Sequence, residues 1–263
     1  MKRTELRRVE SGQSVYYIFP ELEALRFFRH WITSRHGGVS EGGYSSLNLG
    51  DHVGDIAESV TENRRRVSKM FTGGLPIYLP EQVHSGESVE VSSVSDMRQK
   101  CDAVFVGRAA VPVGVLTADC IPIILADPKT CSAAVVHAGR AGVFKKIVTA
   151  TVQAMSDRFG TETGDLIAAV APGIRSCCYE VGEDVFEGYE EFKPFCSPTG
   201  EGRGMLDMVS ALSSEMESVG LNGEAILDSG ICTSCSSEEF YSHRTETIKG
   251  GSAGRFMTGL SLI

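Results

Sequence analysis

Three side chains that can ligate a metal ion lie at the ends of apolar segments. His84 is in the polar turn 82–86, Cys120 is in a polar break between two apolar runs, and His137 ends a third apolar run. Because side chains at the ends of neighbouring strands can converge, we interpret these residues as one candidate site. Two imidazoles and a thiolate are suitable ligands for tetrahedral Zn²⁺, and they leave the fourth position open, as in catalytic zinc sites.

The same residues also permit chemistry that needs no metal. Cys120 beside either histidine would form a thiolate–imidazole dyad, the arrangement of a cysteine hydrolase that acts on an amide. A histidine at a strand end is also commonly a structural residue, and the three residues match no local zinc motif. The spacing therefore leaves these alternatives open. Asp119 precedes the cysteine and is a candidate to orient a ligand or accept a proton.

Several arginines lie next to glycine or serine in predicted loops, and two or three of them would suffice for an anion pocket. Solvated surface arginine is the alternative interpretation. The five are Arg35, Arg140, Arg175, Arg244 and Arg255.

The chain has eight cysteines. A chain of 263 residues is too long to be a small disulfide-stapled scaffold. The charged N-terminus shows no apolar stretch typical of a signal peptide, so we expect a cytoplasmic protein with reduced thiols. Cys232 and Cys235 form a C-x-x-C pair without a second such pair, which indicates loop thiols rather than a zinc knuckle. The adjacent Cys177 and Cys178 are expected to pack one inward and one outward.

Composition and motifs exclude several functions. The net charge of −9 argues against nucleic acid or an anionic membrane as partner, and the longest apolar run (111–126) is interrupted by polar residues and prolines. Six histidines without a His-x-His pair do not build the copper set of a laccase. The sequence also lacks the usual zinc-deaminase motif and the common glycine-rich nucleotide-binding motifs.

Apolar periodicity predicts the elements that must position these residues. Strands outnumber helices and occur in clusters, which favours an α+β fold. The tail after residue 227 is predicted to be rich in loops. The predicted strands are 25–34, 76–79, 89–94, 103–106, 113–117, 121–126, 133–137, 166–171 and 225–227, and the predicted helices are 55–71, 141–159, 184–192 and 207–219.

A series of short segments, in one order from about residue 25 to the C-terminus, closely resembles the YfiH-like family. Its members are known as laccase-domain proteins or polyphenol oxidases, and later as purine nucleoside phosphorylases. The segments are TSRHGGVS (33–40), YSSLNLGDHVGD (44–55), QVH (82–84), DA (102–103), TADCIP (117–122), VHAG (136–139), YEVG (179–182) and YSHR (241–244).

This resemblance implies one α+β domain over residues 1–263, in which residues 1–24 form an N-terminal strand or extension. It implies two mixed β-sheets packed between helices in four α/β/β/α layers, distantly like the catalytic domain of cytotoxic necrotizing factors. It also implies that His84, Cys120 and His137 bind Zn²⁺. Copper at such a site would be adventitious.

The resemblance further implies phosphorolysis of adenosine, inosine or 5′-methylthioadenosine, with adenosine deamination as a second activity. Its partners would be purine nucleosides and inorganic phosphate. We expect Asp119 to act as a proton shuttle beside the three metal ligands, and Arg35, Asn48 and Arg244 to bind substrate or phosphate. A cysteine hydrolase and a zinc-stabilised binding protein are the alternatives.

The sequence departs from the family pattern directly after the predicted ligand His137, and this change is expected to affect substrate preference. The family usually reads His-Ala-Gly-Trp-Arg-Gly, whereas this chain has Arg140-Ala141-Gly142 after His137-Ala138-Gly139. The change removes an aromatic side chain and moves the arginine forward by one position, but it leaves the proposed zinc ligands unchanged.

Overall fold

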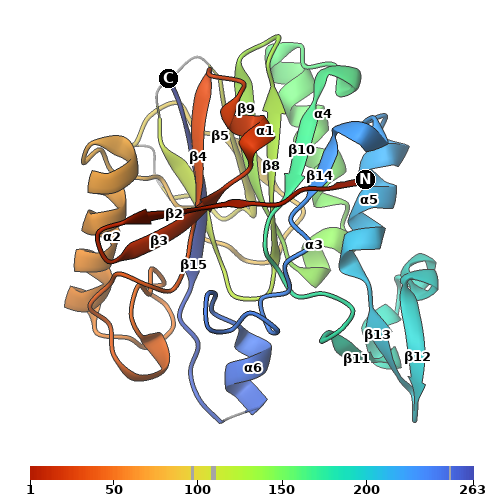
Figure 1. Cartoon of the computed structure of the whole chain (residues 1–263). Helices are drawn as coiled ribbons and strands as arrows, with labels where there is room; N and C mark the ends of the chain where they lie inside the picture. Colours follow the sequence, from red (N-terminus) through yellow and green to blue (C-terminus); the bar gives the residue numbers. More distant parts are fainter. Residues whose placement is uncertain (96–97, 108–110, 249) are drawn as a thin grey trace.

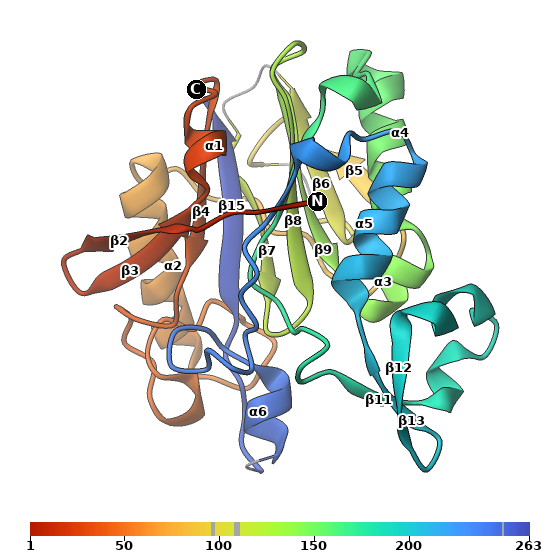
Figure 2. The same ribbon diagram turned by 45° about the vertical axis from the view of Figure 1, so that its right-hand side comes forward.

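Two β-sheets pack face to face between helices in the computed structural model, which describes residues 1–95, 98–107, 111–248 and 250–263 (Figures 1 and 2). Helix α2 covers the outer face of one sheet, and helices α3, α4 and α5 cover the other. These four layers and the α+β class agree with the expectation. The helices are α1 (Pro20–Glu23), α2 (Ala57–Thr72), α3 (Arg140–Phe144), α4 (Ile147–Phe159), α5 (Met208–Ser218) and α6 (His243–Ile248).

The larger sheet is mixed and has the strand order β1-β14-β10-β8-β9-β6-β5. The β1–β14, β14–β10 and β6–β5 pairs are parallel, and the other neighbours are antiparallel. Its strands are β1 (Lys2–Arg3), β5 (Ser88–Glu90), β6 (Ala103–Gly107), β8 (Ile121–Asp127), β9 (Ser132–Ala138), β10 (Ile167–Val170) and β14 (Ile226–Asp228).

The second sheet, with the order β2-β3-β4-β15-β7, is antiparallel throughout. The expectation of two mixed sheets is therefore correct for the larger sheet and wrong for this one. A small antiparallel sheet, β11-β13-β12, projects beside the helical layer (Figure 2). The remaining strands are β2 (Arg7–Ser11), β3 (Ser14–Ile18), β4 (Phe28–Thr33), β7 (Val113–Thr117), β11 (Glu180–Gly182), β12 (Cys196–Gly200), β13 (Arg203–Leu206) and β15 (Phe256–Leu262).

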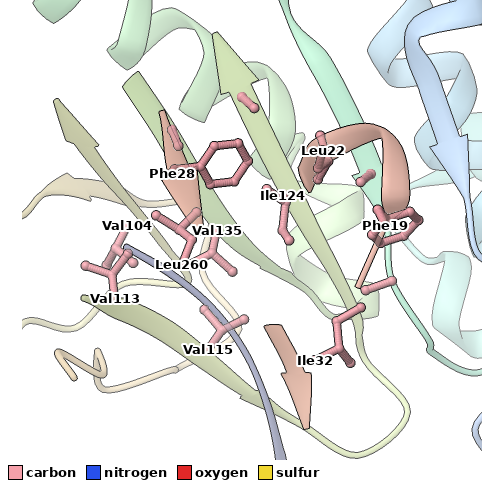
Figure 3. Close-up of a cluster of buried hydrophobic side chains, with 14 of the residues drawn as sticks. Phe19, Leu22, Phe28, Ile32, Val104, Val113, Val115, Ile124, Val135 and Leu260 are labelled. Carbon is pink, nitrogen blue, oxygen red and sulfur yellow. The ribbon is translucent and has the colours of Figure 1, made fainter. Parts of the chain in front are cut away.

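The central strands of the larger sheet are apolar along their whole length because both of their faces are buried. On β8, Ile123 packs toward the helices, whereas Ile124 packs toward the second sheet. Figure 3 shows Ile124 and Val135 in the layer between the sheets, where Leu260 of the other sheet also lies. Because the central strands are packed on both faces, the strand ends that carry the candidate ligands are held in fixed positions.

Several predicted elements differ from the structure. The predicted helix 141–159 is divided into α3 and α4, because Lys146 adopts a left-handed conformation with φ 59°. The predicted helix 184–192 is instead two short 3₁₀ turns, Glu183–Phe186 and Glu190–Phe195. The predicted strand 76–79 is reduced to one bridge between Tyr78 and Val113.

Both terminal segments contribute strands to the sheets. Residues 1–24, expected as an N-terminal strand or extension, contribute β1 to the larger sheet and β2 and β3 to the second, antiparallel sheet. The tail contains α6 and the long central strand β15, where only loops were expected. Among the described residues, no helix has both the length and the apolarity needed to cross a membrane.

Candidate active site

His84, Cys120 and His137 converge at one end of the larger sheet. Their ligand atoms all lie within 4.8 Å of one another, and Cys120 Sγ is 3.7 Å from His84 Nε2. The β8–β9 register pairs Ile121 with Ala138, so Cys120 and His137 lie at adjoining strand ends. His84 lies in the turn before β5, at the same end of the sheet. The structure therefore brings together the three residues that the sequence marked as ligands.

Asp102 orients two of these residues. Its Oδ1 accepts hydrogen bonds from His137 Nδ1 at 2.7 Å and from the His84 backbone N–H at 3.0 Å. Its Oδ2 accepts hydrogen bonds from the backbone N–H groups of Val83 and Ser85 and from the Ser85 hydroxyl. Asp102 is fully buried, and a carboxylate that fixes a histidine ring in this way is typical of metal sites. In the sequence, Asp102 is recognisable only as part of the segment 102–103, with no predicted role.

The three residues form an electrostatically coupled group. Burial opposes ionisation of the Cys120 thiol, but His137 and His84 outweigh this effect and lower its pKa. Burial also opposes protonation of His137, but Cys120 and Asp102 raise its pKa. Without a metal, these opposite pKa shifts favour a thiolate at Cys120 beside an imidazolium at His137. The same sulfur is a good zinc ligand, because zinc binds cysteine as a thiolate.

The donor set fits zinc. His137 Nδ1 is engaged by Asp102, which leaves Nε2 as its ligand atom, and a thiolate and a second imidazole complete three ligands of the kind that zinc prefers. The backbone packs tightly around them. A Cβ at Gly139 would lie 2.7 Å from His84 Cδ2 and 3.0 Å from Cys120 Sγ, so only glycine fits at this position.

The three residues lie in a pocket of about 350 Å³, within the size range of small-molecule sites. Leu116, Ile174 and Met208 form an apolar part of its wall, and Tyr179 contributes a ring. Several lining residues, such as His52, Gln82 and Tyr179, lie in the segments that carry the family resemblance but had no role predicted for them. The polar and charged lining residues beyond the three ligands are His52, Gln82, Thr117, Asp119, Arg140, His243, Arg244 and Arg255.

Three arginines line this pocket, and they differ in how they are held. Arg244 Nη2 donates to the Glu180 carbonyl, and its guanidinium lies over the Tyr179 ring. Arg255 Nη1 donates to two nearby carbonyls. Among the described residues, no hydrogen bond or ion pair engages Arg140, so its guanidinium is the one most available to an anion.

Both carboxylate oxygens of Asp119 are engaged in hydrogen bonds within the pocket wall, so Asp119 does not offer a free carboxylate to the pocket. Its Oδ1 accepts a hydrogen bond from Thr233 Oγ1 at 2.7 Å, and its Oδ2 accepts one from the Arg244 backbone N–H at 2.6 Å. Its own backbone has φ 87°, a strained conformation for a non-glycine residue. The geometry favours a positioning role over the proton-shuttle role expected from the sequence.

The structure does not bring Arg35 and Asn48 into the pocket lining. Arg35 donates to the carbonyls of Ser45 and Ser237 and lies over the Tyr241 ring. Asn48 is fully buried, and its Oδ1 accepts the backbone N–H of Arg255 at 2.8 Å. The expected direct contacts of these two residues with phosphate therefore do not fit the geometry. Asn48 acts on the pocket through Arg255.

Comparison with known proteins gives one family. The family model described as "Multi-copper polyphenol oxidoreductase laccase" matches residues 29–263. A purine nucleoside phosphorylase of Streptomyces coelicolor is 34% identical over 227 residues, which are 85% of this chain and 92% of that protein.

Two solved structures share the fold over nearly the whole chain. YlmD from Geobacillus stearothermophilus superposes with a TM-score of 0.86 at 26% identity, covering 98% of this chain and 99% of that one. The Bacillus licheniformis protein YfiH gives a TM-score of 0.87 at 24% identity, with the same coverage. The likeness to the fold of cytotoxic necrotizing factors stays a prediction.

Proposed function

We propose that this chain, which belongs to the multi-copper polyphenol oxidoreductase laccase family of YfiH-like proteins, is a zinc-dependent purine nucleoside phosphorylase. One observation carries the proposal: two imidazoles and a thiolate converge in a pocket that is also lined by three arginines. Relatives named purine nucleoside phosphorylase at about 30% identity support a nucleoside-processing enzyme, for example in Streptomyces coelicolor (34%) and Geobacillus stearothermophilus (31%).

In phosphorolysis, a phosphate oxygen forms a bond to C1′ of the ribose while the bond from C1′ to the purine nitrogen breaks. The electron pair of that bond leaves with the purine, which then takes up a proton. Arg140 has no competing partner among the described residues, and we assign it to the phosphate, with Arg244 and Arg255 adding positive charge. Fixed charges of this kind stabilise a transition state with little reorganisation.

His84, Cys120 and His137 would hold zinc, which when bound supplies a Lewis acid for a substrate oxygen or nitrogen. Asp102 keeps the His137 ring in the orientation that presents Nε2 to the pocket. The apolar wall, with Ile174 and Met208, suits a purine ring and would accept adenosine, inosine or 5′-methylthioadenosine. Hydrolytic deamination is a second proposed activity of the same pocket: water adds to C6 of adenosine, the C6–N6 bond breaks, and inosine and ammonia are formed.

The decisive experiment measures adenine and ribose 1-phosphate released from adenosine by the zinc-loaded enzyme, with and without phosphate. Phosphorolysis requires that both products form in equal amounts and only with phosphate. Adenine release without phosphate would identify a hydrolase instead. Ammonia and inosine, assayed in the same reactions, report on deamination separately.

Arg140→Ala tests the phosphate assignment. We expect KM for phosphate to rise by about 10- to 100-fold, the effect of losing a charge-assisted hydrogen bond of about 1.5–3 kcal/mol. Arg158→Ala removes an exposed arginine that pairs with Glu90 outside this pocket, and it serves as the matched control. Equal phosphate KM values for both variants would refute the role of Arg140.

A metal-independent cysteine hydrolase is the second candidate, because Cys120 Sγ lies 3.7 Å from His84 Nε2 and, despite burial, the two histidines lower the pKa of its thiol. This candidate predicts that protein stripped of metal retains full amidase activity and that an amide-type electrophile labels Cys120. The phosphorylase proposal predicts instead that stripping removes activity and that added zinc restores it.

A further inference from the structure

We infer that Cys177, Cys178, Cys232 and Cys235 form a second metal site, a tetrathiolate zinc centre that braces one wall of the pocket. The four Sγ atoms all lie within 4.8 Å of one another. Cys235 Sγ is 3.3 Å from Cys178 Sγ and 3.6 Å from Cys177 Sγ. Zn–S bonds of about 2.3 Å in a tetrahedron place sulfurs about 3.8 Å apart, close to these separations.

The sheet topology brings the two cysteine pairs together. Strands β10 and β14 are parallel neighbours, so the turns that follow them leave the sheet at the same edge (Figure 1). The pairing continues beyond the strands, because Gly173 N–H donates to Ile231 O and Thr233 N–H donates to Gly173 O. In this inference the second pair missing from the C-x-x-C motif is the adjacent pair Cys177 and Cys178, and the four residues act as ligands instead of the loop thiols predicted from the sequence.

The four cysteines differ in exposure. Cys232 is only 7% exposed, Cys178 is half-buried, and Cys177 and Cys235 are exposed. A divalent metal can therefore reach the cluster from the surface, and zinc binds cysteines as thiolates.

This cluster is connected to the candidate active site through short hydrogen bonds. Thr233 lies inside the C-x-x-C turn, and its hydroxyl donates to Asp119, which precedes Cys120. Ser234 in the same turn shares a 2.8 Å hydroxyl contact with Thr245, in the first turn of α6. A metal that fixes the C-x-x-C turn therefore fixes both the turn that carries Cys120 and the helix that carries Arg244.

Zinc content per chain tests this inference independently of any enzymatic activity. We expect two zinc ions in protein purified under reducing conditions. The double variant Cys232→Ser/Cys235→Ser should retain one ion, and Cys120→Ser should also retain one. Cys131→Ser removes an exposed thiol on a distant turn, and as the matched control it should retain two. An unchanged zinc content in the double variant would overturn the inference.

A second measurement on the unmodified chain covers the case in which the double variant does not fold. Metal-free, reduced protein is titrated with Zn²⁺ and then alkylated, and peptide mapping identifies the protected cysteines. The inference requires that two equivalents of zinc per chain protect Cys177, Cys178, Cys232 and Cys235 but not Cys131, whichever site fills first. Alkylation of these four at the rate of Cys131 with zinc present, or disulfides among them in place of metal binding, would refute it.

Discussion

At the scale of single residues, the candidate active site depends on side chains that cannot move independently. Asp102 is bonded at once to the His137 ring and to three backbone N–H groups of the turn that carries His84. His84 itself has φ 56°, a conformation that this turn must maintain. The relative positions of the two histidines are thus set by one buried carboxylate before any metal binds.

Gly139→Ala tests how closely the backbone must approach the ligands. The added methyl group would contact His84 at 2.7 Å and Cys120 at 3.0 Å, so at least one ligand must shift. We expect zinc affinity, measured by competition with a chromogenic chelator, to fall by about tenfold or more. Gly164→Ala is the control, because a Cβ there meets no atom within 4 Å. Equal affinities for the two variants would contradict this prediction.

At the scale of elements, helix α2 holds the glycine-rich loop that leads to the pocket. Asn63 of α2 is fully buried, and its side chain accepts the Val39 backbone N–H and donates to the carbonyls of Ser46 and Asn48. Asn48 in turn accepts the backbone N–H of Arg255. One helix side chain therefore supports an arginine of the pocket through the loop between them.

Asn63→Ala leaves these buried backbone groups without partners. We expect a loss of at least about 2 kcal/mol in the free energy of unfolding, measured by urea denaturation. We also expect a higher KM for phosphate, because Arg255 loses part of its support. Asn222→Ala, which removes an exposed asparagine that caps a 3₁₀ turn, should leave KM unchanged. If Asn63→Ala is destabilised but its KM for phosphate is unchanged, the proposed support of Arg255 by Asn63 is contradicted.

The sequence predicts some elements well and others poorly for physical reasons. Strands such as β8 and β9 are recognisable because burial of both faces requires continuous apolar residues. Strand β15 was missed because Gly259 resembles a strand breaker, whereas in the fold it makes room for Trp31, whose ring would lie 2.6 Å from a Cβ there. A contact between residues so far apart in the sequence leaves no local pattern from which the strand could be predicted.

The same distinction applies to the candidate site. The position of His84, Cys120 and His137 at the ends of apolar segments indicated one candidate site, although the spacing alone left a structural role open for each histidine. Arginines beside glycines are common, so the sequence did not distinguish Arg140, which lines the pocket, from Arg35, which fastens a loop. The Cys177–Cys178 pair meets the C-x-x-C turn only because β10 and β14 are parallel neighbours, and this pairing is absent from any local motif.

At the scale of the whole molecule, a buried histidine makes stability depend on pH. His30 accepts the backbone N–H of Phe19 through Nε2, and burial lowers its pKa to about 4. An unfolded chain binds a proton at His30 near pH 6.5, whereas the folded chain does not. The contribution of His30 to the free energy of unfolding is therefore fully present above about pH 6.5 and is lost as the pH falls toward 4.

This linkage predicts that the wild-type protein loses about 2 kcal/mol more stability between pH 7 and pH 5 than His30→Gln does. Glutamine retains an acceptor for Phe19 but does not titrate. Urea denaturation of both proteins at the two pH values gives the comparison directly. Equal losses in the two proteins would show that His30 does not supply this dependence.

The central position of β15 has a consequence for how the molecule is made. This strand, residues 256–262, lies between β4 and β7, whose residues are synthesised much earlier. Until β15 arrives, both partners present unpaired backbone edges, the kind of surface on which nascent chains associate wrongly. Arg255 immediately precedes this strand, so the pocket gains one of its arginines only as the sheet closes.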